Sequence, residues 1–294
     1  MGLEFHHILP LFFTLATAQS TCPDASEIVY SPFKPWFRFD YGPAGGDCWS
    51  GAICTLDQAD AARNQQFAAT ALVMGLLPLV LRDIAWPERR VVLVSAPLPA
   101  FAEILVRALG LEPVAQGNVA GWTEEESQRW VEWIRTSAIA RAGFRSRVKM
   151  VALVTVTSVV LLVSYAALAL IEIYSKRSAL GCVYPVIALT WCLVAVIPGA
   201  IHVVFENFRQ RKAKDAMGGG AGATRASAVQ GADQAWPVQF AWAVYYIIGS
   251  LVFTSIMAIT PLELFVWVVV MAVVVGSSKM LALYICLMLR SPVD

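Results

Sequence analysis

Lys279 is the residue whose type and position most need a chemical explanation. It lies in the apolar stretch from Leu262 to Leu289, which carries no other charge in its interior. A lysine at the centre of a membrane helix costs about 2.5–3.5 kcal/mol on insertion scales. With Ser277 and Ser278 it forms a candidate intramembrane polar site. It could serve a substrate, an ion or a counter-ion, or it could be satisfied by the serine hydroxyls, backbone carbonyls or a carboxylate of another helix.

His202 and Glu206 form a second candidate, an interfacial pair spaced four residues apart near the end of an apolar stretch. Such a pair could bind a metal or move a proton. No cysteine or aspartate is spaced to complete a set of metal ligands, so we predict a hydrogen-bonded pair, with no metal and no cofactor. No nucleophile, base and orienting residue occur together, so we predict no catalytic residues.

Three of the six cysteines, Cys22, Cys48 and Cys54, lie in the polar segment 19–57. In a secretory lumen they would oxidise, and Cys48 with Cys54, or Cys22 with either, are the possible pairs. We expect this segment to be a structured plug over a helix bundle, or alternatively a cap that binds a partner or ligand. The remaining cysteines are predicted to be small apolar packing residues: Cys182, Cys192 and Cys286.

The composition indicates a membrane protein. The 294 residues are 58% hydrophobic and 15% charged, and the mean hydropathy is +0.63. Soluble domains carry about 25% charged residues, so the chain is poor in charge. The net charge of +1 argues against a nucleic-acid-binding surface.

The predicted fold class is all-α, a polytopic transmembrane helix bundle with a small disulfide-stapled extracellular N-terminal segment. Five spans are preferred and six are possible. Residues 1–18 resemble a signal peptide cleaved after Ala18, with an uncleaved anchor as the alternative. The predicted spans are residues 58–86, 150–174, 180–205, 236–259 and 262–289, followed by a cytoplasmic tail, 290–294. Pro185 and Pro198 should kink the third span.

Residues 91–111 are apolar but are not predicted to cross. Pro97 and Pro99 interrupt the first half, and Glu103 and Arg107 stand four residues apart in the second. Such a pair suits a helix side that faces water. We therefore expect a re-entrant or interfacial segment within a cytoplasmic region, 87–149, although a sixth span here is the alternative.

An amphipathic helix is predicted before the second span, with a capping box at Thr123 and Glu126 and a tryptophan-bearing apolar stripe. Basic residues follow it: Arg135, Arg141, Arg145, Arg147 and Lys149. Such a helix could lie on the membrane with its basic end against anionic inner-leaflet lipids, or it could be a solvated linker. Residues 206–235 are predicted to be a flexible basic cytoplasmic loop.

The distribution of basic residues sets the expected topology. With five spans and the N-terminus outside, 16 of the 22 Lys and Arg residues fall inside and five fall outside. If residues 91–111 also crossed, the basic stretches near residues 129–149 and 209–225 would move outside, against the positive-inside rule. The expected location is the plasma membrane or a secretory-pathway membrane, with a cytoplasmic C-terminus.

The run from Asp83 to Arg90, DIAWPERR, follows a short span that contains Pro78. In this respect the chain resembles uncharacterised multi-pass membrane proteins of filamentous fungi, in which a cysteine-bearing lumenal segment also precedes that span. The resemblance covers residues 20–110 and implies no activity or site.

These features favour a non-enzymatic scaffold, sensor or accessory protein, which could have a membrane-protein partner. The first alternative is a small-solute transporter or channel that uses Lys279 in the bundle interior. The second is an intramembrane enzyme, which would depend on Glu103, His202 or Glu206.

Overall fold

The computed structural model describes residues 29–35, 46–80, 91–115, 119–120, 129, 132, 147–176, 179–216, 226–227 and 234–290. The predicted signal peptide, Cys22, the 83–90 run and most of the predicted amphipathic helix lie outside these residues. The described chain is mainly helical. Its helices are α2 (Gly46–Gln58), α3 (Ala61–Leu79), α4 (Ala100–Ala108), α7 (Arg147–Tyr174), α8 (Ala179–Val183), α9 (Ile187–Val194), α10 (Val196–Ala216), α11 (Trp236–Thr254) and α12 (Pro261–Arg290).

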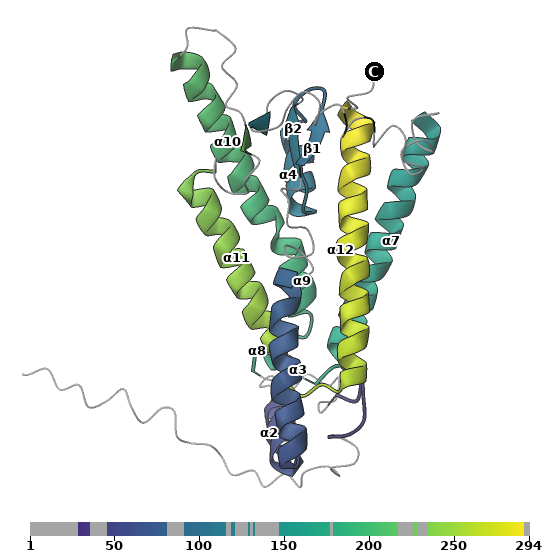
Figure 1. Cartoon of the computed structure of the whole chain (residues 1–294). Coiled ribbons are helices and arrows are strands. Elements are labelled where there is room, and N and C mark those ends of the chain that lie inside the picture. The colour runs from purple at the N-terminus through teal and green to yellow at the C-terminus, as the bar shows by residue number, and fades with distance from the viewer. Residues whose placement is uncertain are drawn as a thin grey trace, which may run out of the picture.

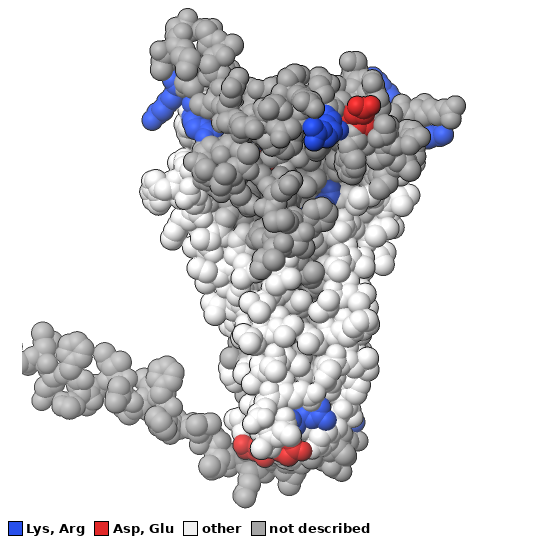
Figure 2. All heavy atoms as spheres, viewed as in Figure 1, with Lys and Arg blue, Asp and Glu red and all other residues white. Residues whose placement is uncertain are grey.

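Four helical segments are long and apolar enough to cross a membrane, among the residues that the structure describes: Arg147–Tyr174, Ile187–Lys212, Trp236–Thr254 and Pro261–Leu289. They correspond to four of the five predicted spans. All four run between two ends of the molecule (Figure 1). We name the lower one, where α2 and α8 lie, the disulfide end and the upper one, where α7 begins and α12 ends, the basic end. Figure 2 shows Lys and Arg gathered at the basic end and an uncharged band across this face below it.

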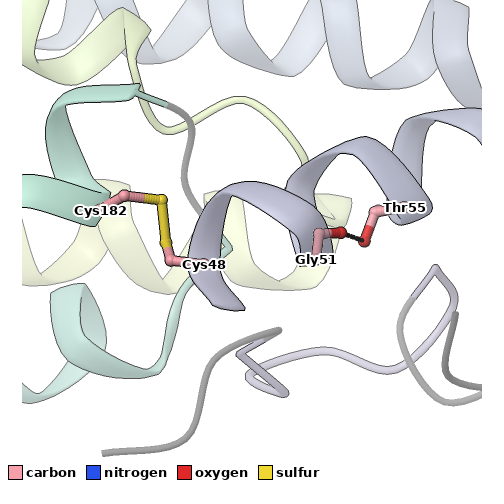
Figure 3. The surroundings of a disulfide bond; sticks show 4 residues. All are labelled: Cys48, Gly51, Thr55 and Cys182. Carbon is pink, nitrogen blue, oxygen red and sulfur yellow. Dashed lines mark hydrogen bonds between the residues drawn. A yellow bond between two sulfur atoms is a disulfide. The ribbon is translucent and has the colours of Figure 1, made fainter. Parts of the chain in front are cut away.

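The predicted first span differs most from the structure. Its predicted start, residue 58, is instead the end of α2, a separate helix in which the Thr55 hydroxyl donates to the Gly51 carbonyl at 2.9 Å (Figure 3). The cap of α3 is Asp60, whose carboxylate accepts from the Arg63 backbone N–H at 2.7 Å. Helix α3 ends at Leu79 and is not among the four membrane-length apolar helices.

The predicted kink in the third span is present. The chain breaks between α8 and α9 around Pro185, and again at Ala195 between α9 and α10. Pro198 follows the second break by three residues, and its ring would clash with the carbonyl of Val194, four residues earlier. Helix α10 then continues to Ala216, so the prediction of a flexible loop from residue 206 was wrong by about three helical turns.

The prediction of an all-α fold missed two small parallel sheets. Strand β1 (Val91–Val94) pairs with β2 (Glu112–Ala115), and β3 (Val119–Ala120) pairs with β4 (Ala226–Ser227). The segment predicted to be re-entrant or interfacial therefore folds as a strand, a nine-residue helix and a strand. We call β1, α4 and β2 the inner unit. Its helix is about 14 Å long, too short to span a ~30 Å bilayer core.

The inner unit lies inside the bundle and not beside it. Helix α4 packs against α10 and α12, and β1 also contacts α12. In Figure 1 the inner unit occupies the space near the basic end, with α10 and α11 on one side and α12 and α7 on the other. All four residues of β1 are buried, because protein covers both faces of the strand.

The disulfide end is held by a cross-link that the sequence interpretation missed. Cys48 of α2 is bonded to Cys182 of α8, with Cα atoms 5.6 Å apart (Figure 3). The predicted pairing of Cys48 with Cys22 or Cys54 was therefore wrong, and so was the prediction that Cys182 is an apolar packing residue. Cys54 is disulfide-bonded as predicted, whereas Cys192 and Cys286 keep their thiols.

Residues 29–35 are tied to the same end by backbone contacts. The Phe33 N–H donates to the Glu263 carboxylate at 2.8 Å, and the Lys176 ammonium donates to the Ser31 carbonyl at 2.5 Å. Burial lowers the pKa of Lys176, and the nearby Glu263 opposes that shift. Glu263 also caps α12 by accepting from the Thr260 N–H. This part of the N-terminal segment is thus packed onto the bundle.

Aromatic rings fill the middle of the core. Trp191 of α9 stacks on Tyr245 of α11 at 4.7 Å between ring centroids and donates its indole N–H to the Tyr245 carbonyl at 2.8 Å. The stack is possible because α11 presents Gly249 at this position. A Cβ on Gly249 would lie 2.5 Å from the Trp191 ring, inside van der Waals contact.

We expect Gly249→Ala to lower the free energy of unfolding by about 1–3 kcal/mol, the usual cost of overpacking a core. The matched control is Gly276→Ala on α12, where an added Cβ meets nothing within 4 Å. That variant should be neutral or gain up to about 1 kcal/mol from helix propensity. Thermal unfolding of the purified variants in detergent measures both. Equal free energies of unfolding for the two variants would contradict this account, because the Trp191 ring would then move aside without cost.

Candidate functional site

Lys279 lies where the inner unit meets α12. Its side chain is buried, and its Cε is 3.8 Å from the position that a Cβ on Gly110 would occupy. The preceding residue, Ser278, donates its hydroxyl to the Leu109 carbonyl at 3.2 Å and to the Val275 carbonyl of its own helix at 3.0 Å. The end of α4 therefore packs against two polar residues of α12, Ser278 and Lys279.

The C-terminus of α4 is shaped by a glycine. Gly110 has φ +96°, and its N–H donates to the Arg107 carbonyl, while the Leu111 N–H donates to the Val106 carbonyl. This is the Schellman arrangement, in which a left-handed residue closes the last turn of a helix. A glycine two residues after the last residue of α4 was a usable signal for this end in the sequence. It allows the chain to reverse beside Lys279 and return as β2.

A small cavity lies beneath this turn. Its volume is about 20 Å³. Residues from α3, α4, α7, α9 and α12 line it: Leu77, Pro78, Ala108, Leu109, Tyr165, Trp191, Cys192, Met271, Val274, Val275, Ser278 and Lys279. A cavity of this size holds about one water molecule. Lys279 is the only charged residue in the lining, and α3 ends one residue after Pro78.

The three residues of the predicted polar site do not act together. Ser278 and Lys279 line the cavity, whereas Ser277 donates its hydroxyl to the Val273 and Val274 carbonyls of its own helix. Hydroxyls that bond back along a helix in this way are satisfied locally. The structure therefore separates Ser277 from the site that the sequence predicted.

A second polar cluster joins the inner unit to α10, and we call it the Arg107 cluster. Arg107 of α4 is buried and makes ion pairs with Glu103 at 2.7 Å and with Glu112 of β2 at 3.1 Å. Its Nη1 lies 2.9 Å from Nε2 of His202 on α10, and that nitrogen is 3.7 Å from the Glu112 carboxylate. Burial opposes the charge of Arg107, but the carboxylates of Glu112 and Glu103 outweigh it, so its pKa is raised.

The Arg107 cluster corrects one prediction and adds partners to a second. The Glu103–Arg107 pair is formed, but Arg107 does not face water, since its side chain is only 5% exposed. For the predicted His202–Glu206 pair, the structure gives each residue a further partner: His202 contacts Arg107, and Glu206 binds Arg209 at 2.7 Å. Glu112 could not be assigned to this cluster from the sequence, because only the parallel pairing of β1 and β2 brings it close to α4.

One further predicted feature, the basic stretch before the second span, has a partial counterpart. Arg147 and Lys149 are exposed at the start of α7, at the basic end, as a lipid-facing role would need. Arg135, Arg141 and Arg145 lie outside the described residues. No group of three His, Cys, Asp or Glu side chains that could hold a metal ion occurs in the described part of the chain.

Close approach of α4 to α10 depends on Gly199. A Cβ there would lie 3.2 Å from the Ile104 carbonyl and 3.5 Å from the Ala108 nitrogen, so the two backbones nearly touch. Small residues permit such contacts between membrane helices. The inner unit is thus held by backbone proximity at Gly199, by the Arg107 cluster, and by Ser278 on the opposite side.

No protein-family model, no curated protein and no solved structure matches this chain.

Arg107→Met should lower the free energy of unfolding by about 3–5 kcal/mol, because Glu103 and Glu112 would lose their shared cation. The matched control is Arg209→Met, whose pair with Glu206 is more exposed and should contribute less than about 1 kcal/mol. Thermal unfolding in detergent reports both values. Neutralising the carboxylates as well, in Arg107→Met with Glu103→Gln and Glu112→Gln, should restore most of the stability. A triple variant as unstable as the single one would contradict this account.

Proposed function

We propose that this protein crosses a membrane five times, with the N-terminus outside and the C-terminus in the cytoplasm, and that it passes a small solute through the interior of the bundle. The four membrane-length apolar helices are typical of a membrane protein. The direction, the fifth crossing and the solute pathway are inferences from the arrangement of charges, cysteines and cavity.

Two independent features support the proposed direction. A disulfide persists in an oxidising compartment, which favours an extracellular or lumenal position for Cys48 and Cys182. Basic residues favour the cytoplasmic side, and the basic end carries exposed Arg147, Lys149, Arg211 and Lys212. Helix α3 starts at the disulfide end, and α7 starts at the basic end (Figure 1). The chain therefore passes from one end to the other once between these two starts, and this passage is the proposed fifth crossing.

The topology can be tested with trypsin on sealed, right-side-out vesicles. We expect the stretch from Lys212 to Arg225 to resist cleavage until the vesicles are permeabilised, because this topology puts it inside. An antibody against a C-terminal tag reports the fragment size. Cleavage in intact vesicles would reverse the proposed orientation, and permeabilised vesicles provide the control for trypsin access.

The cavity beside Lys279 is the observation that carries the proposed transport. Ionisable residues inside membranes commonly mark substrate or ion pathways. Membrane transporters place such sites where discontinuous helices end inside the bilayer. Here α3 and α4 both end at the cavity, and α4 belongs to a unit that reaches it from the basic end.

The two other candidate functions find less support. In the Arg107 cluster both carboxylates are ion-paired to one arginine, which leaves Glu103 and Glu112 poorly placed as a general acid or base. The interpretation as scaffold, sensor or accessory protein rests on the packed N-terminal segment and the basic end alone. The inner unit instead closes the cytoplasmic side of the cavity, as a transport pathway in its occluded state requires.

In liposomes that contain the purified protein, we expect flux of a small ion above that of empty liposomes. Lys279→Leu should reduce the flux at least about tenfold, because it removes the only charge in the cavity lining. The panel of probes is H⁺, Na⁺, K⁺ and chloride, measured with ion-selective electrodes and a pH-sensitive dye. Ser277→Ala, which changes the neighbouring residue but not the cavity, should retain full flux.

Flux of none of these ions, with folded protein in the liposomes, would favour the scaffold. Equal flux in Lys279→Leu and the unmodified protein would remove Lys279 from the pathway. In either case the folded state of each variant is checked by size-exclusion chromatography and thermal unfolding.

A further inference from the structure

We propose that the end of α10, at the basic end of the molecule, binds the headgroups of acidic phospholipids. This inference rests on the proposed membrane location and does not depend on transport through the bundle. It follows from three properties of α10: an exposed apolar face, two cations that continue this face, and an acidic residue that is held on another side of the helix.

The outer face of α10 is apolar over about three turns. Ile197, Val204 and Phe208 have exposed fractions between 48% and 58%. At about 100° per residue, these three positions lie within about 40° of one another around the helix. Exposed apolar patches of this kind mark surfaces that contact a membrane or another protein. Because α10 belongs to a membrane-length segment, the face is suited to lipid chains.

Two cations continue the same face. Arg211 and Lys212 are exposed, and they follow Phe208 by three and four residues, so they lie about one turn beyond its ring and on either side of it. The continuation of α10 to Ala216 fixes this spacing, which a flexible loop would not. Figure 2 shows basic side chains at the upper left, where α10 ends in Figure 1. An apolar face followed by cations is the pattern of interfacial helices.

The acidic residue of this part of α10 is engaged away from the exposed cations. Glu206 pairs with Arg209 at 2.7 Å. Around the helix, Glu206 lies about 160° and Arg209 about 100° from Phe208. In the last turn of α10, Lys214 and Asp215 carry opposite charges. The end of α10 thus has four basic and two acidic residues, a net charge of +2, which an acidic headgroup complements.

The length of the span puts these cations at the depth of the headgroups. The membrane-length segment begins at Ile187, and Arg211 is 24 residues further on. At the helical rise this corresponds to up to about 36 Å. The hydrocarbon core is about 30 Å thick, and the headgroup region adds roughly 5–7 Å on each side. Arg211 and Lys212 therefore reach lipid phosphates, while Phe208 stays at the edge of the lipid chains.

The test is photo-crosslinking of the purified full-length protein in nanodiscs made from equal amounts of phosphatidylglycerol and phosphatidylcholine. Benzoylphenylalanine replaces Phe208, and mass spectrometry counts the adducts of each lipid. Phosphatidylglycerol adducts should exceed phosphatidylcholine adducts at least about threefold, because cations near the membrane surface attract acidic lipids. High salt should reduce the excess through screening. The control position is Phe265 near the start of α12, a ring that is 66% exposed at the disulfide end, where we expect no excess.

Two double variants test whether the charge is responsible. Arg211→Gln with Lys212→Gln should abolish the excess at Phe208. Arg211→Lys with Lys212→Arg should retain it, because the charge is unchanged. Both pairs of changes are at exposed positions, so both variants should fold, and size-exclusion chromatography checks this. Equal adduct ratios at Phe208 and Phe265, or an excess that persists in the neutral variant, would overturn the lipid site.

The crosslinking readout separates this inference from the proposed function. A nanodisc has the same lipids in both leaflets and reports no flux, so the excess is independent of orientation and transport. An excess of phosphatidylglycerol adducts in a protein that passes no ion supports the lipid site and overturns transport. Ion flux without such an excess overturns the lipid site and leaves transport standing.

Discussion

A backbone segment that is packed inside a helix bundle needs hydrogen-bond partners for its N–H and C=O groups, because leaving them unpaired away from water costs free energy. Residues 91–115 meet this constraint in three ways. The two strands pair with each other, the Schellman turn at Gly110 uses two carbonyls at the end of α4, and Ser278 donates to the Leu109 carbonyl. The position of this unit determines where both polar clusters lie.

The two polar clusters differ in how their charges are compensated. In the Arg107 cluster one guanidinium serves two carboxylates and contacts an imidazole, so most of its donors have partners of opposite or complementary character. Buried ion pairs of this kind contribute modestly to stability but are costly to break. At Lys279 the surroundings are a helix end, hydroxyl groups and a small cavity. The Arg107 cluster therefore suits a structural role that holds the inner unit in place, and the surroundings of Lys279 suit a functional site.

At the disulfide end, too, buried polar groups form their hydrogen bonds within the protein. Glu172 is fully buried, yet its carboxylate accepts from the Ala188 and Leu189 N–H groups at the start of α9. Glu263 does the same for α12 and also holds Phe33. Carboxylates at helix N-termini satisfy donors that the helix cannot use and complement its dipole. Together with the Cys48–Cys182 bond they make this end rigid, which leaves the inner unit as the element with fewer covalent constraints.

Hydrophobic length and charge asymmetry were sufficient to predict the membrane-length helices, because both are local properties of about 20 residues. The proline break near Ala195 and the Glu103–Arg107 pair were local as well, and both are present. The Cys48–Cys182 bond joins residues 134 apart in the sequence, and spacing alone cannot predict such a pair. The same holds for Glu112, which reaches Arg107 only through strand pairing.

The sequence by itself determined that Lys279 stands inside a membrane-length apolar helix and that a partner or a function must account for it. Only the tertiary structure decided that Ser278 shares its site while Ser277 does not, and that the end of α4 forms one wall of it. The physical reason is that a helix presents successive residues about 100° apart, so neighbours in sequence face different surroundings. Which surroundings those are depends on segments far away in the chain, whose packing no local pattern encodes.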